Sequence, residues 1–174
     1  MTGVATLATV DAAMGLYSLF DLIGAREAAV RAPEAPGGEV QTPSRILVVE
    51  DDFFAGAQYE DALTEAGYQV MDIVPTADEA IEALIDHRPE LVVMDIRLAG
   101  SRDGVDAAIE IFKRFGVRSI FVSAYSDPAT RARAEAARPF AWLAKPVSQQ
   151  KLVASVEAAL KALDDGSDVT SAGG

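Results

Sequence analysis

Three consecutive carboxylates, Glu50, Asp51 and Asp52, end the first of several short apolar runs, and no base stands beside them. Asp95 ends a later apolar run, and Lys145 follows the last one. Oxygen ligands are what a hard divalent cation such as Mg²⁺ prefers, so these acids would form a cation site if they met beside the amine. An acid that follows a strand is also a common helix cap, and the chemistry therefore depends on whether the fold brings these residues together.

Beyond residue 44, apolar runs alternate with longer segments of helical period. The predicted strands are Ile46–Val49, Val70–Val74, Leu91–Met94, Ile120–Val122 and Phe140–Ala144. The predicted helices are Phe53–Ala66, Ala77–Asp86, Gly104–Phe115, Pro128–Ala137 and Ser148–Leu163. Runs rich in Val, Ile and Leu are typical of parallel strands that are covered on both faces. Strict alternation predicts an α/β fold with a doubly wound, five-stranded parallel sheet, whose functional groups lie at the carboxyl ends of its strands.

This fold would gather the polar residues at one edge of the sheet. Glu50 and Asp51 follow the first strand, Asp95 the third, Ser123 the fourth and Lys145 the fifth. The sequence therefore predicts a small polar site of acids, one hydroxyl and one amine with room for Mg²⁺. For Asp52, the start of the next helix is favoured over a role as a metal ligand.

At these residues the chain resembles the receiver domain of two-component response regulators. The resemblance covers about residues 45 to 163 and is carried by the stretches VVEDD, VVMDIRL, FVSAY and WLAKPV and by Asp103-Gly104. It implies a flavodoxin-like sheet with strand order 2-1-3-4-5 and five helices. It also implies a single-domain bacterial regulator whose partner is a sensor histidine kinase or a histidine phosphotransfer protein.

The resemblance implies roles for the acids at the matching positions. Asp95 is the expected phosphoacceptor, and Glu50, Asp51 and Asp95 are the expected ligands of Mg²⁺ together with the backbone carbonyl of Arg97. The implied activity is limited to self-phosphorylation from a donor and autodephosphorylation. A phosphohydrolase of the haloacid dehalogenase-like group would instead carry a second aspartate where Arg97 stands.

Three further roles follow from the same resemblance. Ser123 and Lys145 are the expected catalytic partners of Asp95, and Ser123 and Trp142 are the expected switch residues. A packing role for Trp142 at the sheet edge is an equal alternative.

The resemblance also implies that the Lys145-Pro146 peptide is cis. The surface of the fourth helix, fifth strand and fifth helix is expected to contact a downstream protein target.

The chain departs from the family pattern in the loop IRLAGSRDG. Its Asp103-Gly104 pair lies one residue later than is common, and Ala99 stands where proline is frequent, so the shape of the metal loop stays open. Arg138-Pro139 stands where glycine-containing turns are common, which predicts a short or irregular fourth helix. This region also carries a basic cluster, which predicts a solvent-exposed face of the fourth helix. The cluster consists of Arg131, Arg133 and Arg138.

Composition limits the partners that suit this chain. Its formal net charge is -12, which repels nucleic acids and anionic membranes, and it has no cysteine for a disulfide or a thiolate site. The apolar segment Leu7–Ile23 contains Asp11 and Asp21 and no basic residues precede it, which disfavours a membrane or targeting helix. We expect a cytoplasmic protein.

Proline and glycine in the stretch RAPEAPGGEVQTPS indicate a linker. The predicted organisation is an N-terminal extension and linker over residues 1–43, a receiver domain over 44–163 and a disordered tail over 164–174. The extension carries an apolar helical stripe that could dock on the domain or pair with a second copy to give a homodimer. A loose extension without such a contact is an equal alternative. The alternative function is accordingly a phosphorylation-independent binding module that acts through this N-terminal helix.

Overall fold

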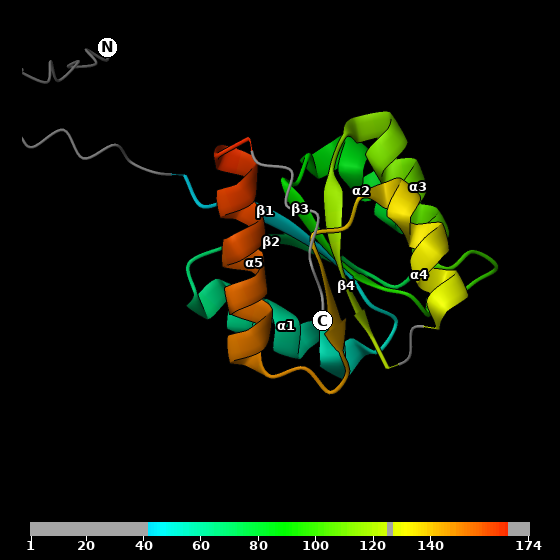
Figure 1. Ribbon diagram of the computed structural model, residues 1–174. Coiled ribbons are helices and arrows are strands. Elements are labelled where there is room, and N and C mark those ends of the chain that lie inside the picture. The colour runs from blue at the N-terminus through cyan, green and yellow to red at the C-terminus, as the bar shows by residue number, and fades with distance from the viewer. Residues whose placement is uncertain (1–41, 125–126, 167–174) are drawn as a thin grey trace, which may run out of the picture. The chain divides into compact units, whose positions relative to one another are not determined.

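The computed structural model describes residues 42–124 and 127–166, where strands and helices alternate (Figure 1). The strands are β1 Arg45–Val49, β2 Gln69–Val74, β3 Leu91–Asp95, β4 Arg118–Ser123 and β5 Ala141–Ala144. The helices are α1 Phe53–Glu65, α2 Ala77–His87, α3 Gly104–Phe115, α4 Pro128–Ala134 and α5 Gln149–Asp164, with a 3₁₀ turn at Glu135–Ala137. The predicted N-terminal helix and the tail beyond residue 166 lie outside the described residues.

All five strands are parallel and follow the order β2-β1-β3-β4-β5, which confirms the predicted fold class. Every residue of β3 and β4 is buried, as expected for strands covered on both faces. Helices α1 and α5 cover one face of the sheet, and α2, α3 and α4 cover the other (Figure 1). The apolar core therefore forms two layers, one on each side of the sheet.

The helices begin at side chains that accept hydrogen bonds from free backbone N–H groups of the first turn. These N-caps are Asp52, Thr76, Asp103, Asp127 and Ser148. Asp52 accepts from the N–H groups of Phe54 and Ala55 at 2.9 and 3.1 Å, which confirms its predicted role as a helix start. One residue separates Thr76 from β2, two separate Asp52 from β1, and three separate Asp127 from β4 and Ser148 from β5. The short loops that end these four strands therefore also start helices.

Helix α4 is short, as predicted. It ends at Ala134 and tightens into the 3₁₀ turn, after which Arg138 adopts a left-handed conformation with φ 49° before Pro139. Among the seven residues of α4, Ala134 is the one that is buried. This helix is therefore joined to the core by little apolar surface.

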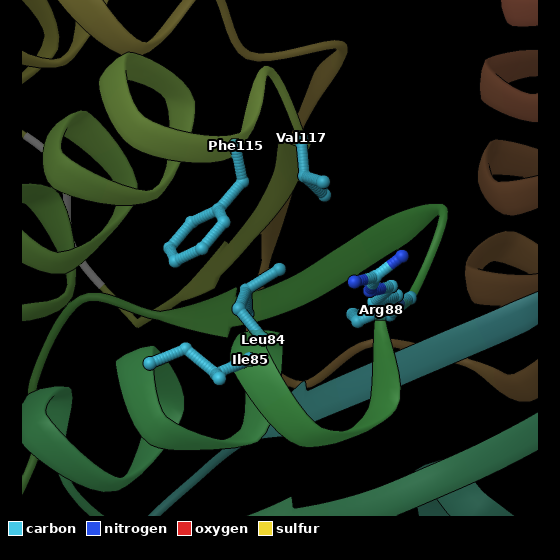
Figure 2. A pocket seen from close by; sticks show the side chains of 6 residues that line it. Leu84, Ile85, Arg88, Phe115 and Val117 are labelled. Atoms are coloured by element: carbon cyan, nitrogen blue, oxygen red, sulfur yellow. The ribbon is translucent and has the colours of Figure 1, made fainter.

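A pocket of about 340 Å³ opens at the amino ends of β3 and β4, the edge of the sheet opposite to Asp95 (Figure 2). It is lined by Leu84, Ile85, Arg88, Pro89, Phe115 and Val117.

In the described part of the chain, no helix is both long enough and apolar enough to cross a membrane.

Gly104 at the start of α3 is required by a close approach of two backbone segments. Its N–H donates to the carbonyl of Ile96 at 2.8 Å. A Cβ atom at this position would lie 1.8 Å from the carbonyl oxygen of Asp95, far inside van der Waals contact. The first turn of α3 thus rests directly on the peptide that follows β3.

We expect Gly104→Ala to lower the free energy of unfolding by about 2–4 kcal/mol, because rigid backbone must move to admit the methyl group. Gly116→Ala is the matched control. Gly116 has φ 72° but open space around its Cβ position, so this change should cost only about 1–2 kcal/mol of backbone strain. Urea unfolding of both variants measures the difference. Equal losses would contradict the steric role of Gly104.

Candidate functional site

The carboxyl ends of four strands bring together the acids, the hydroxyl and the amine that the sequence singles out. Lys145 Nζ donates to both carboxylate oxygens of Glu50, at 2.8 and 2.6 Å, and to Asp95 Oδ2 at 2.6 Å. The side chains of Glu50 and Asp95 are only 1% and 7% exposed, and that of Lys145 is 22% exposed. One ammonium group therefore bridges two buried carboxylates.

Asp51 completes an acidic cluster on the solvent side. One carboxylate oxygen from each of Glu50, Asp51 and Asp95 lies within 4.8 Å of the others. Three carboxylates against the single ammonium of Lys145 leave an excess of two negative charges. An all-oxygen donor set with this excess of charge fits a hard divalent cation.

Burial shifts the pKa values of Glu50 and Lys145 in opposite directions, and the contact between the two residues opposes each shift. Burial raises the pKa of Glu50, the hydrogen bond from Lys145 opposes this, and the charge of Asp95 adds to the rise. Burial lowers the pKa of Lys145, but hydrogen bonds and charges from Asp95 and Glu50 outweigh it and raise that pKa above its usual value. Lys145 is therefore held firmly in its charged form, whereas the pKa of Glu50 stays above its usual value because burial outweighs the hydrogen bond from Lys145.

The second oxygen of Asp95 has a different partner. Asp95 Oδ1 accepts from the backbone N–H of Arg97 at 3.1 Å, and Arg97 itself is exposed. The carboxylate of Asp95 is thus fixed through both of its oxygens. The metal-ligand role of the Arg97 carbonyl stays a prediction.

Ser123 and Lys145 are linked through their main chains. Ser123 at the end of β4 is 6% exposed, pairs in register with Ala144, and its carbonyl accepts from the N–H of Lys145 at 3.0 Å. The Lys145-Pro146 peptide is cis, as predicted. The structure places Ser123 at the same edge as Asp95, and its switch role stays a prediction.

Trp142 on β5 lies in a layered stack. Its ring packs on Phe121 of β4 with centroids 4.6 Å apart, and the guanidinium of Arg131 from α4 lies 4.9 Å from its ring centroid. The half-buried indole therefore touches both the sheet and α4. This geometry suits a packing role and a switch role equally.

The loop after Asp95 has a defined path despite its extra residue. The N–H of Ala99 donates to the carbonyl of Pro75 at 3.2 Å, and Ala99 forms an isolated parallel bridge with Thr76. Proline has no N–H and could not make this bond, which explains alanine at this position. Arg102 then ties the loop to Asp78 and Glu110, at 3.0 and 2.6 Å.

Two contacts of the site region are missed by the sequence reasoning. Glu50 is expected as a metal ligand, yet both of its oxygens also contact Lys145. The predicted solvated face of α4 also makes specific contacts, because Arg133 pairs with Asp103 and, at 3.6 Å, with Asp106. Both contacts join residues far apart in the chain, and spacing alone gives no signal for them.

Comparisons with known proteins agree with this geometry. The model of the response regulator receiver domain matches residues 46–157. The transcriptional regulatory protein PdtaR of Mycobacterium tuberculosis is 32% identical over 122 residues, which are 70% of this chain and 59% of that protein. The phyllosphere-induced regulator PhyR of Methylorubrum extorquens is 31% identical over 67% of this chain and 43% of its own length. The chain thus spans about two fifths to three fifths of the length of these relatives.

A solved structure shows the same fold. The signal receiver domain of a modulated diguanylate cyclase from Desulfovibrio desulfuricans is 32% identical, with a TM-score of 0.68 over 72% of this chain and 99% of that one. The named relatives, the matched family model and the strand order all indicate the same family. The chain belongs to the response regulator receiver domain family.

Proposed function

We propose that this protein is a Mg²⁺-dependent phosphoacceptor of a two-component system, with Asp95 as the residue that receives the phosphoryl group. The observation that carries the proposal is the bridge of Lys145 to Asp95 and Glu50 beside the exposed Asp51. These residues supply a nucleophile, a fixed cation and an acidic cluster with unbalanced charge. The matched family supports the same roles.

The proposed reaction transfers a phosphoryl group from a donor histidine to the carboxylate of Asp95. A carboxylate oxygen of Asp95 forms a bond to phosphorus, the bond from phosphorus to the donor nitrogen breaks, and the donor imidazole keeps the electron pair. The phosphoryl oxygens are negative, so an uncompensated aspartate would repel them. Lys145 offsets that repulsion on Oδ2, while the N–H of Arg97 orients Oδ1.

Glu50, Asp51 and Asp95 would hold Mg²⁺ with their carboxylates, and Arg97 with its backbone carbonyl. When bound, the ion would supply charge neutralisation and orientation of the phosphoryl oxygens. Glu50 would have two roles, because the same carboxylate accepts hydrogen bonds from Lys145 and belongs to the acidic cluster. Ser123 would donate its hydroxyl to the new phosphoryl group and so carry the change toward Trp142.

The proposed phosphodonor is a protein, a sensor histidine kinase or a histidine phosphotransfer protein. Phe53 and Phe54 at the start of α1 are 78% and 77% exposed and lie directly after the acidic stretch. Exposed aromatic side chains beside a reactive group suit a protein contact. We place the receiver domain at residues 44–163 in the cytoplasm, with no enzymatic role beyond its own phosphorylation and dephosphorylation.

The first test uses the small phosphodonor acetyl phosphate, with the intact mass of the full chain as the measurement. We expect one phosphoryl adduct in the presence of Mg²⁺ and none without it, because the carboxylate cluster otherwise repels the donor. The adduct should be absent in Asp95→Asn. The surface variant Asp86→Asn is the control and should be labelled like the wild type. An adduct that survives in Asp95→Asn would overturn the assignment.

The second test concerns the charge balance of the site. Without Mg²⁺, Lys145→Met should lower the free energy of unfolding by about 3 kcal/mol, because two buried carboxylates lose their partner. Mg²⁺ should restore part of this loss and stabilise the variant more than the wild type. The exposed Lys151 provides the control, since Lys151→Met should cost less than about 0.5 kcal/mol. Urea unfolding with and without Mg²⁺ decides; no added effect of Mg²⁺ on Lys145→Met would contradict the proposed metal site.

A further inference from the structure

Helix α4 depends on polar contacts for its position. Ala134 is its one buried residue, so apolar packing contributes little to holding it. Two arginines on it reach other elements. Arg131 lies over the ring of Trp142 on β5, and Arg133 pairs with Asp103 and Asp106 at the start of α3. Arg131 and Arg133 therefore attach α4 to β5 and to α3. Both arginines are exposed, so substitutions at these positions leave the apolar core intact.

The contact of Arg133 with Asp103 is made at a residue with a second task. Asp103 is the N-cap of α3, and its Oδ1 accepts from the N–H of Asp106 at 2.9 Å. Its other oxygen, Oδ2, accepts from Arg133 Nη2. Both oxygens of one carboxylate are thus used, one within α3 and one toward α4. A displacement of Arg133 would pull on the group that fixes the first turn of α3.

That first turn rests on the phosphoacceptor. Gly104 follows Asp103 directly, its N–H donates to the carbonyl of Ile96, and its Cα packs so closely on the Asp95 carbonyl that no Cβ fits. The path from Arg133 to the Asp95 main chain therefore contains one carboxylate and one glycine. Each step is a direct contact between groups with little freedom to adjust.

The ion pair between Arg133 and Asp103 contributes little to the free energy of folding, so stability alone does not explain its presence. Their side chains are 44% and 35% exposed, and ion pairs exposed to this degree contribute little to folding. Arg114 and Glu110 form a pair of similar exposure, 47% and 33%, within α3 itself. The two pairs differ in what they connect, because only that of Arg133 joins α4 to the residue next to Gly104.

We propose that Arg133 is a positioning residue that couples α4 to the phosphoacceptor through Asp103 and Gly104. A change in the position of α4 would then change the reactivity of Asp95, and phosphorylation of Asp95 would change the position of α4. A chain of contacts with few alternative positions can carry coupling between a reactive group and a surface helix. This inference rests on the proposed function, since it concerns phosphorylation of Asp95.

Two readouts on the full chain test the proposal. The first is the rate of phosphoryl uptake from acetyl phosphate with Mg²⁺, followed by intact mass. The second is the fluorescence of Trp142, which is the one tryptophan of the sequence and touches Arg131 of α4. The test variant is Arg133→Gln. Arg114→Gln is the matched control because it breaks an ion pair of similar exposure that lies within α3 and does not reach α4.

We expect Arg133→Gln to slow uptake about 3- to 10-fold, within the range of measured coupling effects. Its Trp142 signal should change by less than half as much on phosphorylation as in the wild type. Arg114→Gln should match the wild type in both readouts. Arg133→Lys should recover part of the rate, and Asp103→Asn, which keeps a capping side chain, should add nothing to Arg133→Gln.

Equal behaviour of Arg133→Gln and Arg114→Gln would overturn the proposal and leave a plain surface ion pair. A wild type that is phosphorylated without any change at Trp142 would overturn it too, because α4 would then not respond. Failure of the proposed function itself has a separate signature, since the wild type would show no adduct in the mass spectrum.

Discussion

The site depends on the ammonium group of Lys145, which bridges two carboxylates that the sheet buries at its carboxyl edge and offsets part of their charge. Glu50 comes from the end of β1 and Asp95 from the end of β3, and each would carry a large desolvation cost alone. Lys145 reaches them from beyond β5, past the intervening β4. The long lysine stem makes this reach feasible, and the backbone bond to Ser123 fixes where the stem begins.

The loop after Asp95 shows how a departure in sequence is absorbed by local bonding. The late position of Gly104 adds length between the acceptor and α3, and the added length is held at both ends. Ala99 joins the segment after β2, and Arg102 joins the loop to α2 and α3. Gly104 then returns the chain to the Asp95 carbonyl, so the acceptor keeps a rigid support.

The sequence predicts the fold and the gathering of the site well, because both follow from local signals. Apolar runs define the parallel strands and Asp52 marks a helix start, while the strand order comes from the family resemblance and places the polar ends at one edge. Which oxygen binds which nitrogen does not follow from spacing. Lys145 and Glu50 are 95 residues apart and Arg133 and Asp103 are 30 apart, so their pairing is decided by side-chain reach after folding.

Helices α5 and α4, which lie on opposite faces of the sheet, differ in how firmly they are held. On one face, α5 buries Leu152, Val156 and Leu160 against the sheet, which makes its displacement costly. On the other, α4 buries Ala134 and otherwise depends on two exposed arginines. A change of a few kcal/mol at Asp95 is small against the first kind of packing and comparable with the second. The proposed phosphorylation of Asp95 would therefore be expressed most readily at α4, beside the stacked ring of Trp142.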